Sequence, residues 1–328
     1  MVYKPWAVLE TKSPSVLKRM LFERDAGSTF SGTVFLFLVL VVDDMENRDI
    51  EYFDRLWFDS QPKDGMVHNR ETWDRMAEGW KKDPPEVQAA KNQQCIDMMQ
   101  FFLERGVITE DSNVIDIGCG SGNYASLFAK TANWVTCSDV SPKMLELCKG
   151  TMDEQGIENV DYIDCDFLTL DVDKSDWVKK YDLVFTSLTP AMDGAKSIEK
   201  VSKVSRRWCF NNSFVYRKDN LRNAVMENVF DKPVTNRWGN SSTYCLFNIL
   251  WQMGLTPEIR YYKEVINHEY DLTMEMAKGV AINVIRDREP NEEEIKRTFA
   301  YLETMAVDGR ITKTTESLFS WILWNVGD

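Results

Sequence analysis

The segment VIDIGCGSGNYA, from Val114 to Ala125, constrains the fold of this chain more than any other stretch. Apolar residues around Asp116 predict a buried strand over 113–117, and glycines follow at every second position, at 118, 120 and 122. Glycine tolerates positive φ and has no Cβ, so a ligand can approach the main chain closely there. A glycine turn that joins a strand to a helix therefore predicts a nucleotide-type binding loop.

Strands and helices are expected to alternate along the rest of the chain. Strands are predicted at 113–117, 133–139, 159–166, 181–188, 206–214, 256–265 and 316–326. Helices are predicted between them, for example at 141–156, where Ser141 can cap the first turn and Pro142 suits the first helical position. Such alternation indicates an α/β fold, a doubly wound, mostly parallel sheet covered on both faces. Its ligands bind at the carboxyl ends of the strands, where the glycine turn lies.

Two kinds of cofactor compete for this turn. Gly120, Gly122 and Ala125 fit the spacing of a dinucleotide-binding loop, and Asp139 lies at the distance where that motif has its acidic residue. Asp116 argues against a dinucleotide, because a carboxylate directly before the turn would repel a pyrophosphate. A positively charged cofactor would instead be attracted to Asp116.

Four segments in order resemble the signatures of the class I, Rossmann-like S-adenosylmethionine-dependent methyltransferases of the small-molecule type: DIGCGSG, TCSDVS, CDFLTLD and YDLVFTSLTPAM. The resemblance extends from about Asn69 to Asn325. It implies a seven-stranded sheet, S-adenosylmethionine as cofactor, and a transferase that catalyses methylation. The cofactor carries a positive charge at sulfur and an α-amino group, and both suit a carboxylate near the turn.

The resemblance also implies a role for individual residues in cofactor binding. Gly118, Gly120 and Gly122 would admit the methionine portion, Asp139 would take the ribose, Asp166 and Phe167 would flank the adenine, and Ser187 would lie near the methyl group. The residues themselves leave alternatives open. Asp116 could cap the turn, Asp139 could cap the next helix in competition with Ser141, Asp164 could replace Asp166, and Phe167 could belong to the core.

A lid insertion is expected at NRETWDRMAEGWKK, which places Trp73, Met76, Ala77 and Trp80 on one helical face. Related small-molecule methyltransferases carry a similar segment that folds over the cofactor, so Trp80 is a candidate cofactor contact. The alternative is a helix packed on the core, since aromatic stripes at helical spacing are usually buried. The segment 266–290, with a helix through Leu272, Met276 and Val280, is a second candidate wall.

The catalytic residue is unknown from the sequence. Methyl transfer mainly requires alignment of the acceptor and exclusion of water, so no catalytic triad is expected. His268, expected to follow strand six, is a weak candidate for a general base, and His68 is a weaker one. The fourth signature reads TSLTP and not Asn-Pro-Pro-aromatic, which disfavours a nucleobase or glutamine acceptor.

The amino-acid composition limits which binding partners are expected. The net charge of −13 disfavours nucleic acid, so we expect a small-molecule acceptor. The seven cysteines are odd in number and include no CxxC pair, which predicts reduced thiols, a cytoplasmic protein and no metal site. An acidic surface could also attract basic protein tails, so a protein methyltransferase stays open. So do a non-catalytic cofactor-binding module and, less favoured, an NAD-dependent dehydrogenase.

The amino-terminal part of the chain is harder to interpret. The apolar run at 34–42 is shorter than the about 20 residues that a membrane-spanning helix needs, so no stable membrane insertion is expected. It could be a buried strand, a signal-peptide core, or part of a leader that ends near Met45 or Met66. We expect an N-terminal extension over 1–65 and a methyltransferase domain over 66–328, in an oligomeric state that the sequence leaves open.

Overall fold

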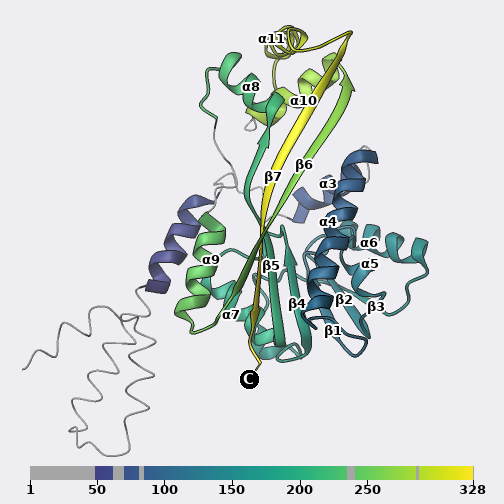
Figure 1. Cartoon of the computed structure of the whole chain (residues 1–328), viewed down its shortest axis with the longest axis vertical. Helices are drawn as coiled ribbons and strands as arrows, with labels where there is room; N and C mark the ends of the chain where they lie inside the picture. The colour runs from purple at the N-terminus through teal and green to yellow at the C-terminus, as the bar shows by residue number, and fades with distance from the viewer. Residues whose placement is uncertain (1–48, 62–69, 81–84, 235–240, 286–287, 328) are drawn as a thin grey trace, which may run out of the picture.

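The computed structural model describes residues 49–61, 70–80, 85–234, 241–285 and 288–327, and one seven-stranded sheet organises them (Figure 1). Its order is β3-β2-β1-β4-β5-β7-β6. The strands are β1 (Asn113–Ile117), β2 (Trp134–Asp139), β3 (Val160–Asp164), β4 (Tyr181–Ser187), β5 (Ser205–Asp219), β6 (Glu258–Asp271) and β7 (Arg310–Asn325). Strands β1 to β5 pair in parallel, and β7 runs antiparallel to both β5 and β6. The expected doubly wound, mostly parallel sheet is confirmed.

Helices cover both faces of this sheet. They are α3 (Arg70–Trp80), α4 (Pro85–Glu104), α5 (Ala125–Phe128), α6 (Pro142–Gln155), α7 (Ala195–Val204), α8 (Asn220–Asn228), α9 (Ser241–Gln252), α10 (Met274–Ile285) and α11 (Glu292–Glu303). Residues 49–60 form a further helix. Helices α4, α5 and α6 enclose one apolar core, and helix 49–60, α7 and α9 enclose a second core on the other face.

The helix ends follow the residues that the sequence provides. Ser141 caps α6, accepting a hydrogen bond from the N–H of Met144, and Gly156 ends this helix in the left-handed conformation at φ 65°. Asn291 and Glu294 form a reciprocal capping box at the start of α11. The predicted cap of α4, Asp83, lies outside the described residues.

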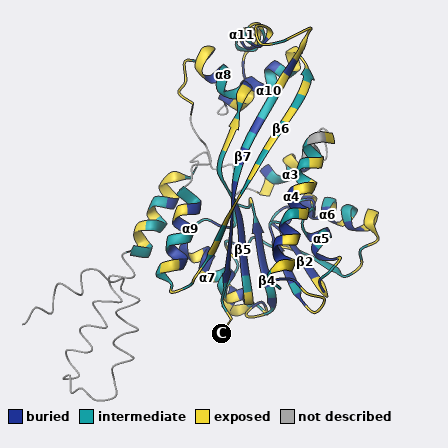
Figure 2. Cartoon of the chain, in the orientation of Figure 1, coloured by how far each residue is buried: buried dark blue, intermediate teal, exposed yellow. Residues whose placement is uncertain are grey.

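A lobe beyond the sheet was not expected from the sequence. Strands β5, β6 and β7 continue past their neighbours and carry α8, α10 and α11 at their far ends (Figure 1). The lobe has its own apolar core, with Leu221, Val284 and Leu302 among its buried residues. The helix expected within 266–290 is present but begins only at Met274, because residues 266–271 complete β6. Half-buried and exposed residues alternate along β6 (Figure 2).

Helix 49–60 packs against α7 and α9. Trp57 is 3% exposed and belongs to the same apolar core as these two helices. The carboxylate of Asp54 accepts a hydrogen bond from the N–H of Ala195 at 2.6 Å, at the start of α7. A Cβ at Gly194 would lie 2.3 Å from Asp54 Oδ1, so glycine is needed where the two helices meet. This part of the expected extension is therefore packed on the sheet domain.

The rest of the expected extension, with the apolar run at 34–42, lies outside the described residues. Within the described ranges, no helix combines the length and the apolar character that a membrane crossing needs.

Candidate cofactor site

The loop between β1 and α5 has positive φ at Gly118 (76°), Gly120 (52°) and Gly122 (81°), as the sequence predicts for a tight turn. A Cβ at Gly118 would lie 2.3 Å from Thr189 Oγ1, and one at Gly122 would lie 2.7 Å from Cys148 Sγ. A Cβ at Gly120 would meet no heavy atom within 4 Å. Packing inside the protein therefore requires the first and third glycines, whereas Gly120 borders open space that a ligand can enter.

Asp139, at the end of β2, fastens this loop. Its Oδ2 accepts a hydrogen bond from the N–H of Gly120 at 3.0 Å, and its Oδ1 accepts one from the N–H of Ser141 at 2.9 Å. Burial raises the pKa of Asp139, while these two backbone N–H groups act in the opposite direction. Each carboxylate oxygen has a second lone pair, so Asp139 can still accept hydrogen bonds from ribose hydroxyls.

Asp116 is a buried carboxylate with unused hydrogen-bonding capacity. It is 2% exposed, and its Oδ2 has no hydrogen-bond partner among the residues that the structure describes. Burial raises the pKa of Asp116 well above its ordinary value, and Cys148 and Asp139 add to the shift. It does not cap the turn through Gly118 or Cys119, whose N–H groups both bond to the carbonyl of Ser138. A cationic partner would offset the cost of burying this group.

The candidate adenine contacts near the end of β3 differ in how available their side chains are. Both oxygens of Asp164 accept hydrogen bonds from the guanidinium of Arg70, at 2.5 and 3.0 Å, so this carboxylate is engaged. Asp166 is half-buried, and its carboxylate accepts a hydrogen bond from the N–H of Leu168. The ring of Phe167 is buried in the core and stacks on Trp177, with centroids 6.5 Å apart. The predicted flanking of adenine by the Phe167 side chain is therefore corrected, because that ring faces the core.

Helix α3 lies at the carboxyl ends of β2 and β3, where a lid over the cofactor is expected. The hydroxyl of Ser141 donates a hydrogen bond to Asp74 at 2.5 Å, and Arg70 pairs with Asp164. Ala77 is buried, Trp73 is half-buried and Met76 is 45% exposed. Trp80 is the last residue of α3, and its side chain lies outside the described residues, as does the whole of His68. Polar contacts at two strand ends thus hold α3 in place.

Comparison with known proteins identifies this arrangement. Residues 108–239, which span β1 to β5 with their loops, match the protein family described as "Methyltransferase domain". The match assigns residues 108–239 to a methyltransferase domain. The cofactor of such domains is S-adenosylmethionine.

Similar proteins include a curated 23S rRNA (uracil(1939)-C(5))-methyltransferase of Shewanella sediminis, 28% identical over 120 residues. The match covers 36% of this chain and 26% of that protein, so the chain spans about a quarter of the length of this relative. A crystal structure of a candidate methyltransferase from Bacillus halodurans is 14% identical and has a TM-score of 0.46, covering 72% of this chain and 100% of that one. Magnesium protoporphyrin IX methyltransferase from Synechocystis with bound S-adenosylmethionine is 16% identical and has a TM-score of 0.43, covering 59% and 87%.

A polar network lies beside the glycine loop of the methyltransferase domain, and the sequence predicted only one of its members, Ser187. The side-chain amide of Asn212, the partner of Ser187 in the neighbouring strand, donates to Ser187 Oγ at 2.9 Å and to the hydroxyl of Tyr124 at 3.5 Å. The hydroxyl of Tyr124 donates to Gln94 Oε1 at 3.0 Å. Asn212 Oδ1 and Gln94 Nε2 are buried and have no hydrogen-bond partner among the described residues. Residues of α4 and β5 carry no motif, so only their contacts reveal this network.

His268 does not belong to this site. It was expected after strand six, but it lies within β6, opposite Lys313 of β7, and its ring contacts Tyr270 at 4.3 Å. Trp321 of β7 lies opposite Asn212, which pairs with Ser187 at the end of β4. From Trp321 to Lys313 the strand runs roughly 25 Å, at about 3.3 Å per residue. His268 is therefore too far along the strand to act as a base in the methyltransferase domain.

Proposed function

We propose that this chain transfers the methyl group of S-adenosylmethionine to a small molecule by in-line displacement at the sulfonium. The observation that carries the proposal is Asp116, a buried carboxylate with an unpartnered oxygen, next to a loop that leaves open space at Gly120. A cationic cofactor would supply the missing charge. A pyrophosphate in the same place would instead oppose ionisation of this carboxyl group.

The proposed contacts follow from the geometry of the loop. Gly120 admits the methionine portion while Gly118 and Gly122 let the loop pack closely, Asp139 holds the ribose, and Asp166 contacts the adenine. Asp116 faces the positive end of the cofactor, and α3 closes over it. For the adenine we retain Asp166 alone, since the ring of Phe167 is packed against Trp177.

Alignment is the main catalytic contribution that this arrangement offers. Ser187 ends β4, and the next residue, Leu188, has a positive φ of 51°, which is strained for a residue with a side chain. Asn212 holds both of them, through its side chain to Ser187 and through its carbonyl to the N–H of Leu188. We propose that the acceptor lies against this corner. Correct alignment with the C–S bond supplies about 7–11 kcal/mol in favourable cases.

Calorimetric titration tests the cofactor. Purified chain is titrated with S-adenosylmethionine, S-adenosylhomocysteine and NAD⁺ in parallel. We expect both sulfur nucleosides to bind and NAD⁺ not to bind. Binding of NAD⁺ alone would overturn the proposal in favour of a dehydrogenase.

The identity of the acceptor is the second part of the proposal. One similar protein acts on 23S rRNA, which makes RNA the main rival to a small molecule. We favour the small molecule because the net charge is −13, and because basic residues such as Lys203 and Arg206 are paired with Asp173 and Asp182. Cations that are already paired attract a phosphate backbone less strongly.

Transfer of a radioactive methyl group tests this choice. The labelled cofactor and the chain are incubated with three fractions of one cell extract: total RNA, total protein and the filtrate of small molecules. We expect label in the filtrate. Label in RNA that nuclease removes would support the RNA rival, and label in protein would support a protein methyltransferase. Binding of the cofactor with no transfer to any fraction would favour a non-catalytic module.

A further inference from the structure

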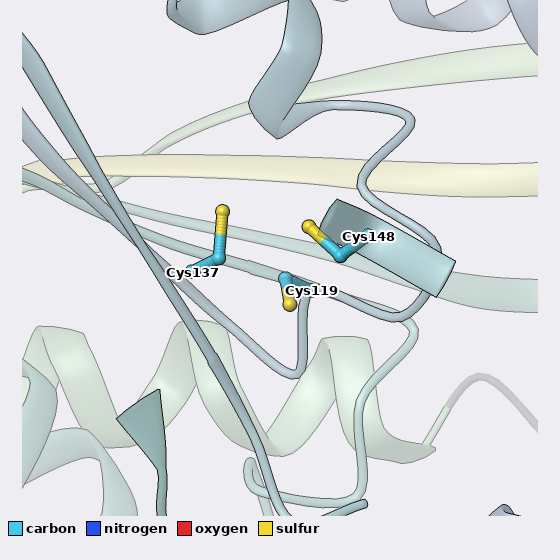
Figure 3. A group of neighbouring side chains, drawn as sticks. All are labelled: Cys119, Cys137 and Cys148. Atoms are coloured by element: carbon cyan, nitrogen blue, oxygen red, sulfur yellow. The ribbon is translucent and has the colours of Figure 1, made fainter. Parts of the chain in front are cut away.

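Three cysteines that are far apart in the sequence meet beneath the glycine loop. Cys119 lies in the loop, Cys137 in β2 and Cys148 in α6 (Figure 3). Their Sγ atoms all lie within 4.8 Å of one another, and the three residues are 8%, 0% and 0% exposed. The sequence predicted no metal site because no two cysteines have CxxC spacing. The fold nevertheless brings together three cysteines from separate elements.

The surrounding backbone is shaped to let these thiols meet. Cys148 Sγ lies 2.7 Å from where a Cβ of residue 122 would be, so only glycine at 122 leaves room for this thiol. Strands β1 and β2 pair in parallel, and Cys137 of β2 lies opposite Asp116 of β1. The loop that carries Cys119 directly follows β1. All seven cysteines of the chain are free thiols, so no disulfide occupies this group.

We propose that Cys119, Cys137 and Cys148 bind one thiophilic ion, Cu(I). Cysteine sulfur selects soft ions. Three sulfurs at about 2.3 Å from one ion, the usual metal–thiolate distance, lie roughly 4 Å apart in a trigonal plane, which the observed spacing allows. Zinc takes four ligands in a closed site, and the group contains only these three within the ranges that the structure describes. Cu(I) is satisfied by three sulfurs.

The charge balance of the site is simple. Each thiol that becomes a ligand releases its proton to solvent, and the ion neutralises part of the negative charge that results. Cys119 lies between Gly118 and Gly120, so an occupied site fixes the loop from below. The ion site does not rest on the proposed function, because it can be measured without any cofactor.

Competitive titration tests the site. Reduced full-length chain is titrated with Cu(I) without oxygen, in the presence of the chromophoric chelator bicinchoninate and without S-adenosylmethionine. We expect one Cu(I) per chain and an X-ray absorption spectrum with three sulfur neighbours. Cys137→Ser and Cys148→Ser should each weaken binding by at least about 100-fold, since even residues that only support a metal ligand contribute about 10–100-fold. Cys209→Ser changes a buried cysteine outside the group and should bind as the wild type does.

Three results would overturn the proposal: no Cu(I) retained by the wild-type chain against the chelator, nitrogen or oxygen neighbours in the spectrum, or equal affinity in Cys148→Ser. The titration and the spectrum are both measured on the wild-type chain. The proposal can therefore be tested even if a variant fails to fold. One-to-one binding of Zn(II) in preference to Cu(I) would also overturn the choice of ion.

Discussion

The carboxylate of Asp139 accepts a hydrogen bond from the N–H of Gly120, with 3.0 Å between Oδ2 and nitrogen. This bond joins the end of β2 to the one glycine of the loop whose missing Cβ leaves open space. The loop is therefore held in shape before a ligand arrives, which reduces the ordering cost of binding. Asp139, which was expected to bind the cofactor or to cap a helix, thus also stabilises the loop between β1 and α5.

Asp139→Ala should lower both stability and cofactor affinity. It leaves the N–H groups of Gly120 and Ser141 without their acceptor, at about 1–3 kcal/mol for each buried group. We expect a lower melting temperature and at least about tenfold weaker binding of S-adenosylmethionine, by thermal denaturation and calorimetry. Asp166→Ala is the comparison, since Asp166 is half-buried and should affect affinity more than stability. Unchanged affinity in Asp139→Ala would remove this residue from the site.

Asp116→Asn should change the pH dependence of both folding and binding. Because burial raises the pKa of Asp116 in the folded chain, the folded state holds a proton that the unfolded state loses near pH 4. Stability therefore falls as pH rises from that value to the folded pKa, and the asparagine variant should lack this fall. Affinity for the cationic cofactor should rise with pH over the same window in the wild type only. Parallel pH profiles for the two proteins would contradict the role of Asp116.

Gly118→Ala and Gly120→Ala should behave differently. Alanine at 118 would clash with Thr189, so we expect a large loss of stability, well beyond the about 1–2 kcal/mol of left-handed backbone strain. Alanine at 120 has open space and costs only that strain, yet its methyl group projects into the proposed ligand space. We expect Gly120→Ala to fold and to bind the cofactor more weakly. Wild-type affinity in this variant would show that the ligand approaches elsewhere.

Arg70→Met should free the lid helix while leaving stability nearly unchanged. The Arg70–Asp164 pair is about half exposed, and such pairs contribute about 0–1 kcal/mol. We expect faster dissociation of S-adenosylmethionine in stopped-flow measurements. Arg206→Met breaks a similar ion pair with Asp182 at the opposite end of the sheet and is the matched control. Equal dissociation rates in the two variants would argue against a lid.

Trp57→Ala tests whether helix 49–60 belongs to the folded unit. Trp57 is 3% exposed, and truncation of a buried tryptophan costs about 3–5 kcal/mol. Phe58→Ala, at a residue that is 68% exposed, should change stability little. We propose that the domain begins before residue 66, so a chain that starts at Met66 should unfold at a lower temperature than one that starts at Met45. Equal melting temperatures for the two truncations would restore the boundary at 66.

The alternation of strands and helices was predictable because each element carries a local signal. The strand at 113–117 has the predicted bounds, and Ser141 and Gly156 mark the ends of α6 as expected. The far ends of β5, β6 and β7 were not predictable. Few of their residues are buried against the main sheet domain, and the core that they support gathers side chains from α8, α10 and α11.

The sequence by itself determined the sheet, the glycine loop and the acidic positions around it, because periodicity, glycine and capping residues act over a few neighbours. Only the tertiary structure decided that Phe167 faces the core, that Asp164 pairs with Arg70, and that His268 lies far along β6. It also brought together the sulfurs of Cys119, Cys137 and Cys148. The physical reason is the same in each case: the direction and neighbours of a side chain depend on elements distant in sequence, whose packing no local pattern records.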